Sequence, residues 1–209
     1  MAFDFKREYR ALYLPKAQPA LVTVPQMRYV AVRGRGDPNL PDGDFARAVA
    51  ALYAVSYAIK MSKRGDRRIE GYYDFVVPPL EGFWQQPGVH GVDYANKDAF
   101  QWIACIRLPD FVGRDDFAWA LEAAAKKGLA CVDAEYLTLE EGLCVQAMHT
   151  GSYDDEPVTI ARLHAFAAEN GYVEDLSPSR RHHEIYLSDP RRTAPEKRKT
   201  VIRIPVRKA

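Results

Sequence analysis

The chain has 209 residues, and its 29 Lys or Arg residues nearly balance its 28 Asp or Glu residues, which leaves a net charge of +1. This balance gives no general attraction to nucleic acid or to a membrane surface, and it argues against a protein that imitates nucleic acid. The length fits one ordinary domain, or two small modules that share one core.

The cysteines and the first residues indicate the compartment. Cys105, Cys131 and Cys144 form no CxxC pair and leave one cysteine over, which is typical of a reducing environment. Residues 1–13 are charged and contain no apolar run, so they do not resemble a secretion signal. Because no stretch approaches the roughly 20 apolar residues that cross a bilayer, we expect a cytoplasmic protein without a membrane segment.

The first half of the chain predicts a strand, a helix and two further strands. Residues 1–26 are expected to form an N-terminal arm, because Pro19 and Pro25 interrupt any helix there. Residues 27–33 alternate as a strand, and residues 45–60 carry the apolar stripe of a helix. Aromatic and β-branched residues predict strands over 69–77 and 100–108, with Pro78 and Pro79 ending the first of them.

The second half predicts elements in the same order. A connecting helix over 117–127 follows two aspartates and ends before a glycine. Residues 143–149 predict a strand, residues 151–157 a turn, and residues 159–170 a helix that starts near Pro157. Strands over 182–187 and 199–206 close the chain. The basic loop between them also holds acidic residues and no aromatic residue, so it indicates a solvated loop rather than a nucleic-acid patch.

Short similarities recur in the same order in the two halves. The matching segments are 106–109 with 202–205, 30–36 with 145–151, and 70–72 with 184–186. Repeated segments that cannot bury their own sheet face pack on one another. We therefore predict an α+β fold of two pseudo-symmetric β-α-β-β modules, with antiparallel sheets around a central ligand cleft. The modules are placed at 27–112 and 113–209 within a single domain over 1–209.

Glu184 is the leading candidate for a functional residue. Strand alternation places it on one face with His182 and Tyr186, whereas Ile185 and Leu187 are expected to cover the helices. A carboxylate in an aromatic cleft attracts a cation or accepts a proton, and desolvation should raise its pKa above about 4.3 unless a cation compensates. The same strand alternation is equally consistent with an exposed Glu184 that pairs with an Arg or Lys on the surface.

Other candidates come from several parts of the chain. Two carboxyl groups in one pocket can act as general acid and general base, so Glu81 is a candidate partner for Glu184. His149, at the end of a strand, is either an acid–base partner or a hydrogen-bonded turn residue. The candidate aromatic walls of the cleft, each of which is individually more often a core residue, are Tyr72, Tyr73, Trp84, Trp102, Tyr153 and Tyr186.

No cofactor, metal or fused DNA-binding domain is expected. The histidines and cysteines lack the spacing of metal ligands. Residues 33–36 lack the GxGxxG spacing of a nucleotide loop, and no GxSxG elbow is present. Residues 1–24 are too short for a three-helix DNA-reading domain and lack a helix-turn-helix pattern.

Several motifs resemble the GyrI-like small-molecule-binding family. The most specific is the run from His182 to Arg191, and the others are 151–157, 163–172, 79–84 and 100–102. The resemblance spans residues 27–206 and implies two β-α-β-β modules around a pocket, as in the ligand domains of multidrug-sensing transcription activators. It also implies that Glu184 corresponds to a buried glutamate that meets cationic, lipophilic drugs.

The stand-alone branch of that family includes proteins similar to hydrolases that open cyclopropane rings of DNA-alkylating natural products. These use glutamate and aromatic residues. Gln85 and Gln86 depart from that branch, in which another aromatic residue is expected after Trp84.

Three functions stay open at this point. The first is a protein that binds small lipophilic, often cationic aromatic molecules through Glu184 and aromatic residues. The second is a hydrolase in the same pocket, with Glu184 or Glu81 placing the water. The third is an interaction module for a protein such as gyrase.

Overall fold

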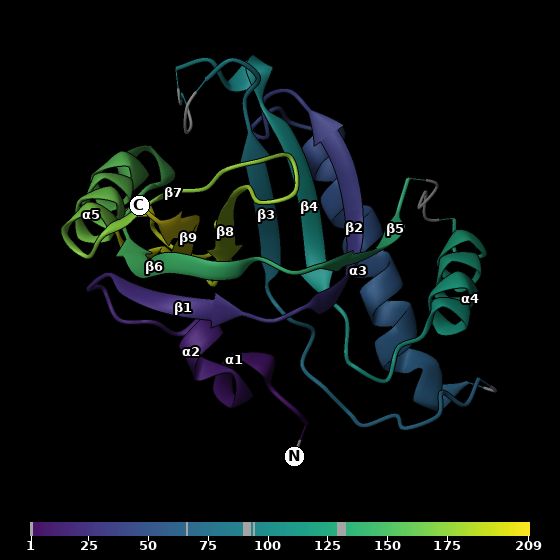
Figure 1. The fold of residues 1–209 in the computed structure, drawn as a ribbon. Helices are drawn as coiled ribbons and strands as arrows, with labels where there is room; N and C mark the ends of the chain where they lie inside the picture. The colour runs from purple at the N-terminus through teal and green to yellow at the C-terminus, as the bar shows by residue number, and fades with distance from the viewer. Residues whose placement is uncertain (1, 66, 90–92, 94, 129–132) are drawn as a thin grey trace.

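A nine-stranded sheet organises the protein (Figure 1). The computed structural model describes residues 2–65, 67–89, 93, 95–128 and 133–209. Every strand pair within these residues is antiparallel. The strands are β1 (Ala20–Val24), β2 (Met27–Arg35), β3 (Leu80–Gln85), β4 (Gln101–Arg107), β5 (Glu135–Leu139), β6 (Gly142–Thr150), β7 (Tyr172–Glu174), β8 (His182–Tyr186) and β9 (Lys199–Lys208).

Five α-helices lie in the described part of the chain, and they surround the sheet unevenly. Two short ones precede the sheet, one long helix follows β2, one follows β4 and one follows β6. In chain order they are α1 (Phe5–Glu8), α2 (Arg10–Tyr13), α3 (Asp44–Met61), α4 (Arg114–Ala125) and α5 (Glu156–Glu169). None of them is long and apolar enough to cross a bilayer.

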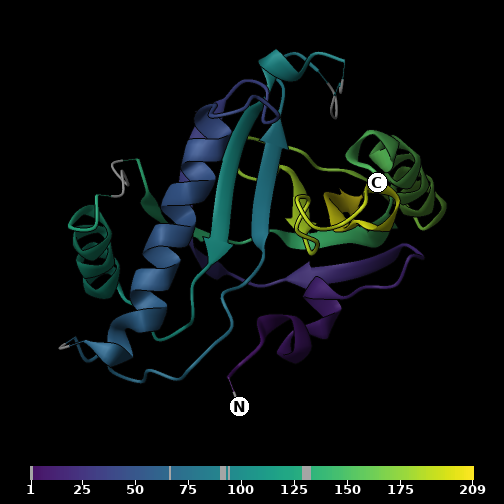
Figure 2. The same cartoon turned by 180° about the vertical axis from the view of Figure 1, so that it is seen from behind.

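Helices α3 and α5 lie on one face of the sheet, one over each half (Figures 1 and 2). Phe45 of α3 stacks on Trp84 of β3, with ring centroids 5.5 Å apart. Leu163 of α5 packs in a separate apolar cluster with Ile202 of β9. Glu184 stands directly opposite Ile202 in the β8–β9 pair. Because directly paired residues share a face of the sheet, Glu184 lies on the face that these helices cover.

The N-terminal helices α1 and α2 cover the opposite face at the centre of the sheet. Tyr13 of α2 donates a hydrogen bond of 3.1 Å to Glu81 of β3, and Glu81 stands directly opposite Ile185 in β8. The prediction that Ile185 packs under the helices of the two modules is therefore wrong. Leu187, predicted to do the same, lies beyond the last residue of β8.

The sequence misplaced one central strand and missed several elements. No strand forms over 69–77; β3 begins at Leu80, after both prolines. Proline lacks the N–H that a central strand must donate, so Pro78 and Pro79 precede the strand rather than follow it. The expected N-terminal arm contains α1, α2 and β1, and Pro19 and Pro25 fall outside them. Strands β5 and β7 were also not expected.

In the two halves of the sheet, corresponding strands come in the same order when the sheet is followed outward from its centre. The order is β3, β4, β2, β5 on one side and β8, β9, β6, β1 on the other. Val30 pairs with Ile106, and Val145 pairs with Ile204. The sequence similarity matched Ile106 with Ile202. If Val30 corresponds to Val145, the strand pairing instead makes Ile106 correspond to Ile204.

The same correspondence relates Gly82 to Glu184. Gly82 pairs with Ala104 as Glu184 pairs with Ile202, and Gly82 and Glu184 pair with each other at the centre of the sheet. The segment 70–72, matched to 184–186 by sequence, lies in a turn and supports no such correspondence. That the two modules superpose stays a prediction.

Candidate functional site

A pocket of about 720 Å³ opens on the helix-covered face of the sheet. Phe45 of α3 lines one side of it, Glu156 at the start of α5 lines another, and Trp84, Glu184 and Tyr186 line it from the two central strands. The volume is in the range of sites that enclose small organic molecules. The central strands thus carry the functional side chains, and α3 and α5 complete the walls.

Aromatic rings form most of the apolar lining. Phe45 stacks on Trp84, and Phe100 meets the edge of Trp84 with centroids 5.3 Å apart. Tyr153 meets Tyr186 edge to face, with centroids 5.8 Å apart. These contacts hold the rings in fixed orientations, which lets the pocket accept a flat molecule with little loss of side-chain entropy.

Gly82 makes room for the polar side of the pocket. A Cβ at this position would lie 2.7 Å from Trp84 Nε1 and 3.1 Å from the Tyr186 hydroxyl oxygen. Those two atoms form a hydrogen bond of 3.0 Å, in which the indole N–H donates to the hydroxyl oxygen. The missing side chain at Gly82 therefore permits the contact that orients Tyr186.

Glu184 is buried and held by two neighbours on its own strand. Its Oε2 accepts a hydrogen bond of 2.7 Å from the Tyr186 hydroxyl, and its Oε1 lies 2.9 Å from His182 Nε2. Only 6% of Glu184 is exposed. The prediction that His182, Glu184 and Tyr186 share one face of the strand is confirmed by these contacts.

The protonation state of Glu184 follows from those contacts. Burial alone would raise its pKa, but hydrogen bonding and charge from His182, with hydrogen bonds from Tyr186 and Glu156, lower the pKa below 4.5. The expected increase does not occur, because His182 supplies the compensating partner. Tyr186 keeps its proton, since burial first and the Glu184 charge second raise the pKa of its hydroxyl well above 10.

Glu156 is a second carboxyl group in the pocket, and the sequence did not point to it. It is 1% exposed, and its side chain hydrogen-bonds to Glu184. A hydrogen bond between two carboxyl groups requires one proton. A glutamate before Pro157 at a helix start is typical of a helix N-terminus, so the local pattern hid its role.

Charged side chains lie at the mouth of the pocket. The Arg198 guanidinium lies over the Tyr153 ring, 5.3 Å from its centroid. Lys97 Nζ lies 3.4 Å from Asp154 Oδ1. The mouth therefore carries both signs of charge, whereas the buried part of the lining holds two carboxyl groups, Glu184 and Glu156.

Comparison with known proteins places the chain in a family. The family model of the GyrI-like small molecule binding domain matches residues 17–207. The chain belongs to the GyrI-like family. The resemblance predicted from the motifs is confirmed, and the pocket belongs to a small-molecule-binding domain.

Several solved structures match over nearly the whole chain. An uncharacterized conserved protein from Listeria innocua is 45% identical with a TM-score of 0.92, covering 98% of this chain and 100% of that one. A hydrolase from Listeria innocua is 44% identical with a TM-score of 0.91, covering 99% and 100%. The EcmrR C-terminal domain is 15% identical with a TM-score of 0.53, covering 92% and 98%, and shows the same fold. The comparison with curated proteins gave no match.

Two other predicted residues of the GyrI-like domain lie near the pocket without lining it. Trp102 stands opposite Trp84 in the β3–β4 pair and packs edge-on against Phe45, beneath the pocket wall. His149 Nδ1 lies 2.9 Å from Thr159 Oγ1, and its Nε2 lies 3.0 Å from the Ser152 carbonyl oxygen. These are the contacts of a turn residue that fixes the start of α5.

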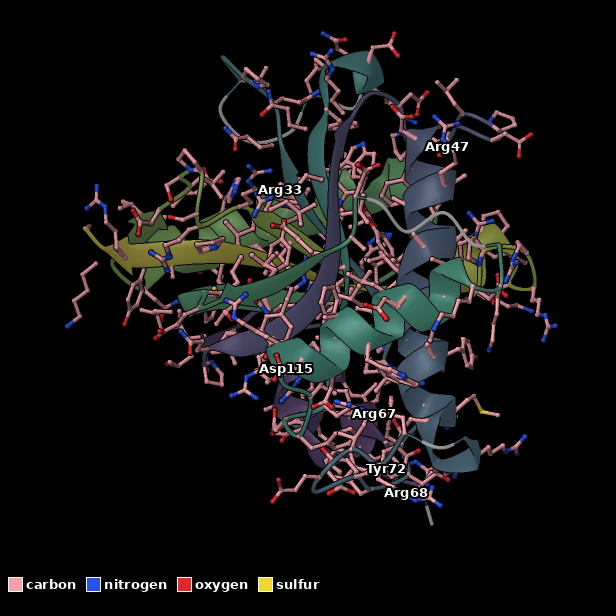
Figure 3. All side chains as sticks on the ribbon, turned by 90° about the vertical axis from the view of Figure 1, so that its right-hand side faces the viewer. Arg33, Arg47, Arg67, Arg68, Tyr72 and Asp115 are labelled. Atoms are coloured by element: carbon pink, nitrogen blue, oxygen red, sulfur yellow. The ribbon has the colours of Figure 1, made fainter. Side chains whose placement is uncertain are left out.

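Three further predicted residues lie away from the pocket. Tyr72 is at the end of α3 remote from Arg47 (Figure 3), where its hydroxyl donates to the Lys60 carbonyl oxygen. Tyr73 packs against Phe111 in the same region. Glu81 is 1% exposed but faces away from the pocket, because alternation in β3 puts it on the side opposite to Gly82. Glu156 occupies the place predicted for Glu81.

The thiols and histidines show no metal-binding arrangement within the described residues. No group there of three or more His, Cys, Asp or Glu side chains could hold a metal ion. Cys105 and Cys144 are buried free thiols, and Cys131 lies outside the described residues.

Proposed function

We propose that the protein is a hydrolase that adds water to a strained, electrophilic ring of a lipophilic aromatic molecule bound in this pocket. The observation that carries the proposal is the hydrogen-bonded pair of buried carboxyl groups, Glu184 and Glu156, at the floor of an aromatic pocket. The hydrolase from Listeria innocua, 44% identical over its full length, supports the same reaction class.

The two carboxyl groups suit opposite roles. Glu184 is held as a carboxylate by His182 and Tyr186, so it can orient a water molecule and take its proton during attack. We assign the proton of this pair to Glu156, which can donate it. Two carboxyl groups whose environments separate their protonation states are the usual arrangement for paired acid and base work.

The substrate class that we favour has a cyclopropane conjugated to a carbonyl group. Water oxygen bonds to a ring carbon, one carbon–carbon bond of the ring breaks, and its electron pair moves to the carbonyl oxygen. Glu184 accepts a proton from the water, and Glu156 gives a proton to that oxygen. The product is an alcohol that contains the elements of one water molecule. The hydrogen bond between Glu184 and Glu156 then returns the proton and restores the starting state.

The test is incubation with a cyclopropane-containing alkylator, followed by mass spectrometry. The wild-type protein should give a product heavier by one water, and Glu184→Gln and Glu156→Gln should each reduce the rate on the order of 100-fold or more, as expected for a lost acid or base. Glu169→Gln, at the exposed other end of α5, is the matched control and should keep the rate. Equal rates in all four proteins would contradict the assignment.

A second function has one observation in its favour. Glu184 is held as a carboxylate among aromatic rings, which is the arrangement that captures organic cations. If the protein only binds cationic aromatic molecules, Glu184→Gln should weaken a cationic dye more than a neutral dye of the same shape in a fluorescence titration. Equal weakening of both dyes would exclude charge recognition by Glu184.

A further inference from the structure

A second cluster of ionisable side chains lies behind the pocket, on the other face of the same strands. His183 precedes Glu184 in β8, and Glu81 precedes Gly82 in β3, so both side chains face away from the pocket. Glu141, between β5 and β6, and Arg203 of β9 complete the cluster. All four are at most 1% exposed.

His183 lies between two carboxylates. Its Nδ1 is 3.0 Å from Glu141 Oε2, and its Nε2 is 3.0 Å from Glu81 Oε2. Arg203 Nη1 donates a hydrogen bond of 2.7 Å to Glu141 Oε1 and is farther, at 3.4 Å, from His183 Nδ1. A neutral imidazole would turn one bare nitrogen toward a carboxylate oxygen. An imidazolium turns an N–H toward each carboxylate, and the cluster then holds two positive and two negative charges.

The electrostatic environment agrees with this charge state. Burial would lower the pKa of His183, but charge and hydrogen bonding from Glu141 and Glu81 outweigh it and raise the pKa above 6.5. Burial would raise the pKa of Glu141, but His183 and Arg203 lower it to about 2. The charges of His183 and Glu141 are therefore sustained by their neighbours at positions closed to solvent.

The N-terminal segment seals this cluster. Tyr13 donates to Glu81 over 3.1 Å, and Arg203 Nη2 donates 2.8 Å to the Leu12 carbonyl oxygen. Gln146, which accepts a hydrogen bond from Arg203 Nε, donates 2.6 Å to the Ala11 carbonyl oxygen. These N-terminal residues precede the family match at 17–207. Residues outside the matched region thus complete a site behind the pocket floor.

The cluster also joins the strands that carry the pocket. His183 stands directly opposite Arg203 in the β8–β9 pair, and it stands opposite Phe83, the neighbour of Gly82, in the β3–β8 pair. The ring of His183 stacks on Phe83 with centroids 3.9 Å apart. His183 therefore joins β8 directly to Glu81 of β3 and, through Glu141, to Arg203 of β9, one residue away from Glu184.

We propose that His183 is a positioning residue for the pocket: with Glu81, Glu141 and Arg203 it forms a charge-balanced clamp that fixes β8 and so aims Glu184 at the bound molecule. The link to catalysis rests on the proposed hydrolase function, whereas the clamp itself does not. A buried cluster with no net charge predicts a specific pattern in variants, because losing one charge leaves another without compensation.

The decisive experiment is a double-variant cycle. His183→Gln leaves one excess negative charge, Glu81→Gln leaves one excess positive charge, and the double variant is again neutral. With a cyclopropane-containing alkylator as substrate, each single variant should lose roughly 100-fold in kcat, the effect of a misplaced catalytic group, with a smaller change in KM. The double variant should recover about 10-fold over either single variant, within the coupling seen between contacting residues. Losses that multiply in the double variant would overturn the clamp.

A matched control is the His164–Glu174 pair, 3.7 Å apart, in which the His164 side chain is 42% exposed. His164→Gln, Glu174→Gln and their combination should leave kcat unchanged. A loss and recovery in this pair similar to that at His183 and Glu81 would show that the pattern is not specific to the buried cluster.

A second measurement needs neither substrate nor turnover. Nitrogen-15 NMR of the wild-type protein at neutral pH should show both His183 ring nitrogens protonated, and a neutral-tautomer spectrum would overturn the proposal. The Glu184 carboxyl carbon signal should shift in His183→Gln and return in the double variant; an unchanged signal in all variants would also overturn it. A wild-type protein that opens no ring but passes both NMR tests contradicts the hydrolase function and leaves the clamp in place.

Discussion

At the residue scale, the two central strands place glutamates and histidines on both faces of the sheet, in two separate sites. Glu184 lines the pocket with His182 beside it on the same face, and His183 faces the ion cluster with Glu81. Strand alternation puts the adjacent His182 and His183 on opposite faces. What alternation could not supply was the partner on each face, because Glu156 and Glu141 come from distant segments and resemble ordinary helix-start and turn residues.

The pH dependence of stability is a prediction at this scale. The folded-state pKa of His183 is raised, so its stabilising charge is fully present below its unfolded value of 6.5 and is lost as pH rises through the folded value. The pKa of Glu141 is lowered to about 2, so its contribution is present above 4.5 and is lost as pH falls toward about 2. We expect the free energy of unfolding from urea titrations to fall on both sides of the window from 4.5 to 6.5.

The comparison variant for that series is Glu141→Gln, which removes a charge from the cluster without a change of shape. Its stability should be lower and should depend less on pH at the acid side. A variant with the same acid-side slope as the wild-type protein would mean that other carboxyl groups control acid unfolding.

Gly82→Ala is a second residue-scale prediction. The added Cβ would crowd Trp84 Nε1 at 2.7 Å and the Tyr186 hydroxyl at 3.1 Å, so their hydrogen bond must lengthen or break. We expect a loss of stability of roughly 1 to 3 kcal/mol, as for other overpacked sites, and a changed tryptophan emission spectrum. Gly65→Ala, where the nearest atom would lie 3.8 Å away, is the control. An unchanged spectrum in Gly82→Ala would show that the pocket adapts without moving Trp84.

At the element scale, the strands with clear alternation were predictable and the others were not. β2, β6, β8 and β9 lie close to their expected ranges, because each is flanked by turns and carries apolar residues on a regular period. The strand prediction was displaced from β3 because it gave weight to Tyr72, Tyr73 and Phe75. These residues instead pack against Phe111. β1 and β5 are edge strands of five residues each, which is too short for a clear periodic signal.

The N-terminal helices give a prediction at the element scale. Tyr13→Phe removes only the hydroxyl that donates to Glu81, which leaves a buried carboxylate oxygen with one donor fewer. We expect the free energy of unfolding to decrease by about 1 to 3 kcal/mol and hydrogen exchange in β3 and β8 to become faster. Tyr57→Phe, at a position that is 51% exposed, should change neither. If exchange speeds up only within α1 and α2, the helices are attached to the sheet but do not support its centre.

At the scale of the whole molecule, the α+β class and the antiparallel sheet were predictable from the repeated order of elements. The register of the repeat was not: the recurring Ile-Arg motif aligned Ile106 with Ile202, whereas the strand pairing relates it to Ile204. Short motifs cannot detect a shift of two residues, because such a shift keeps every side chain on its original face. The module boundaries at 27–112 and 113–209 stay a prediction that superposition of the halves tests.

The pairing of Gly82 with Glu184 at the centre of the sheet has a stereochemical consequence. At this pair β8 carries a carboxylate and β3 a residue without a side chain, so the two sides of the pocket offer different groups to the two enantiomers of a substrate. Water held by Glu184 would reach a flat ring system from one side only. We therefore expect a racemic cyclopropane substrate to be consumed in one enantiomer, which chiral chromatography of the remaining substrate would reveal; equal consumption of both would mean that the ring opens without being held against Glu184.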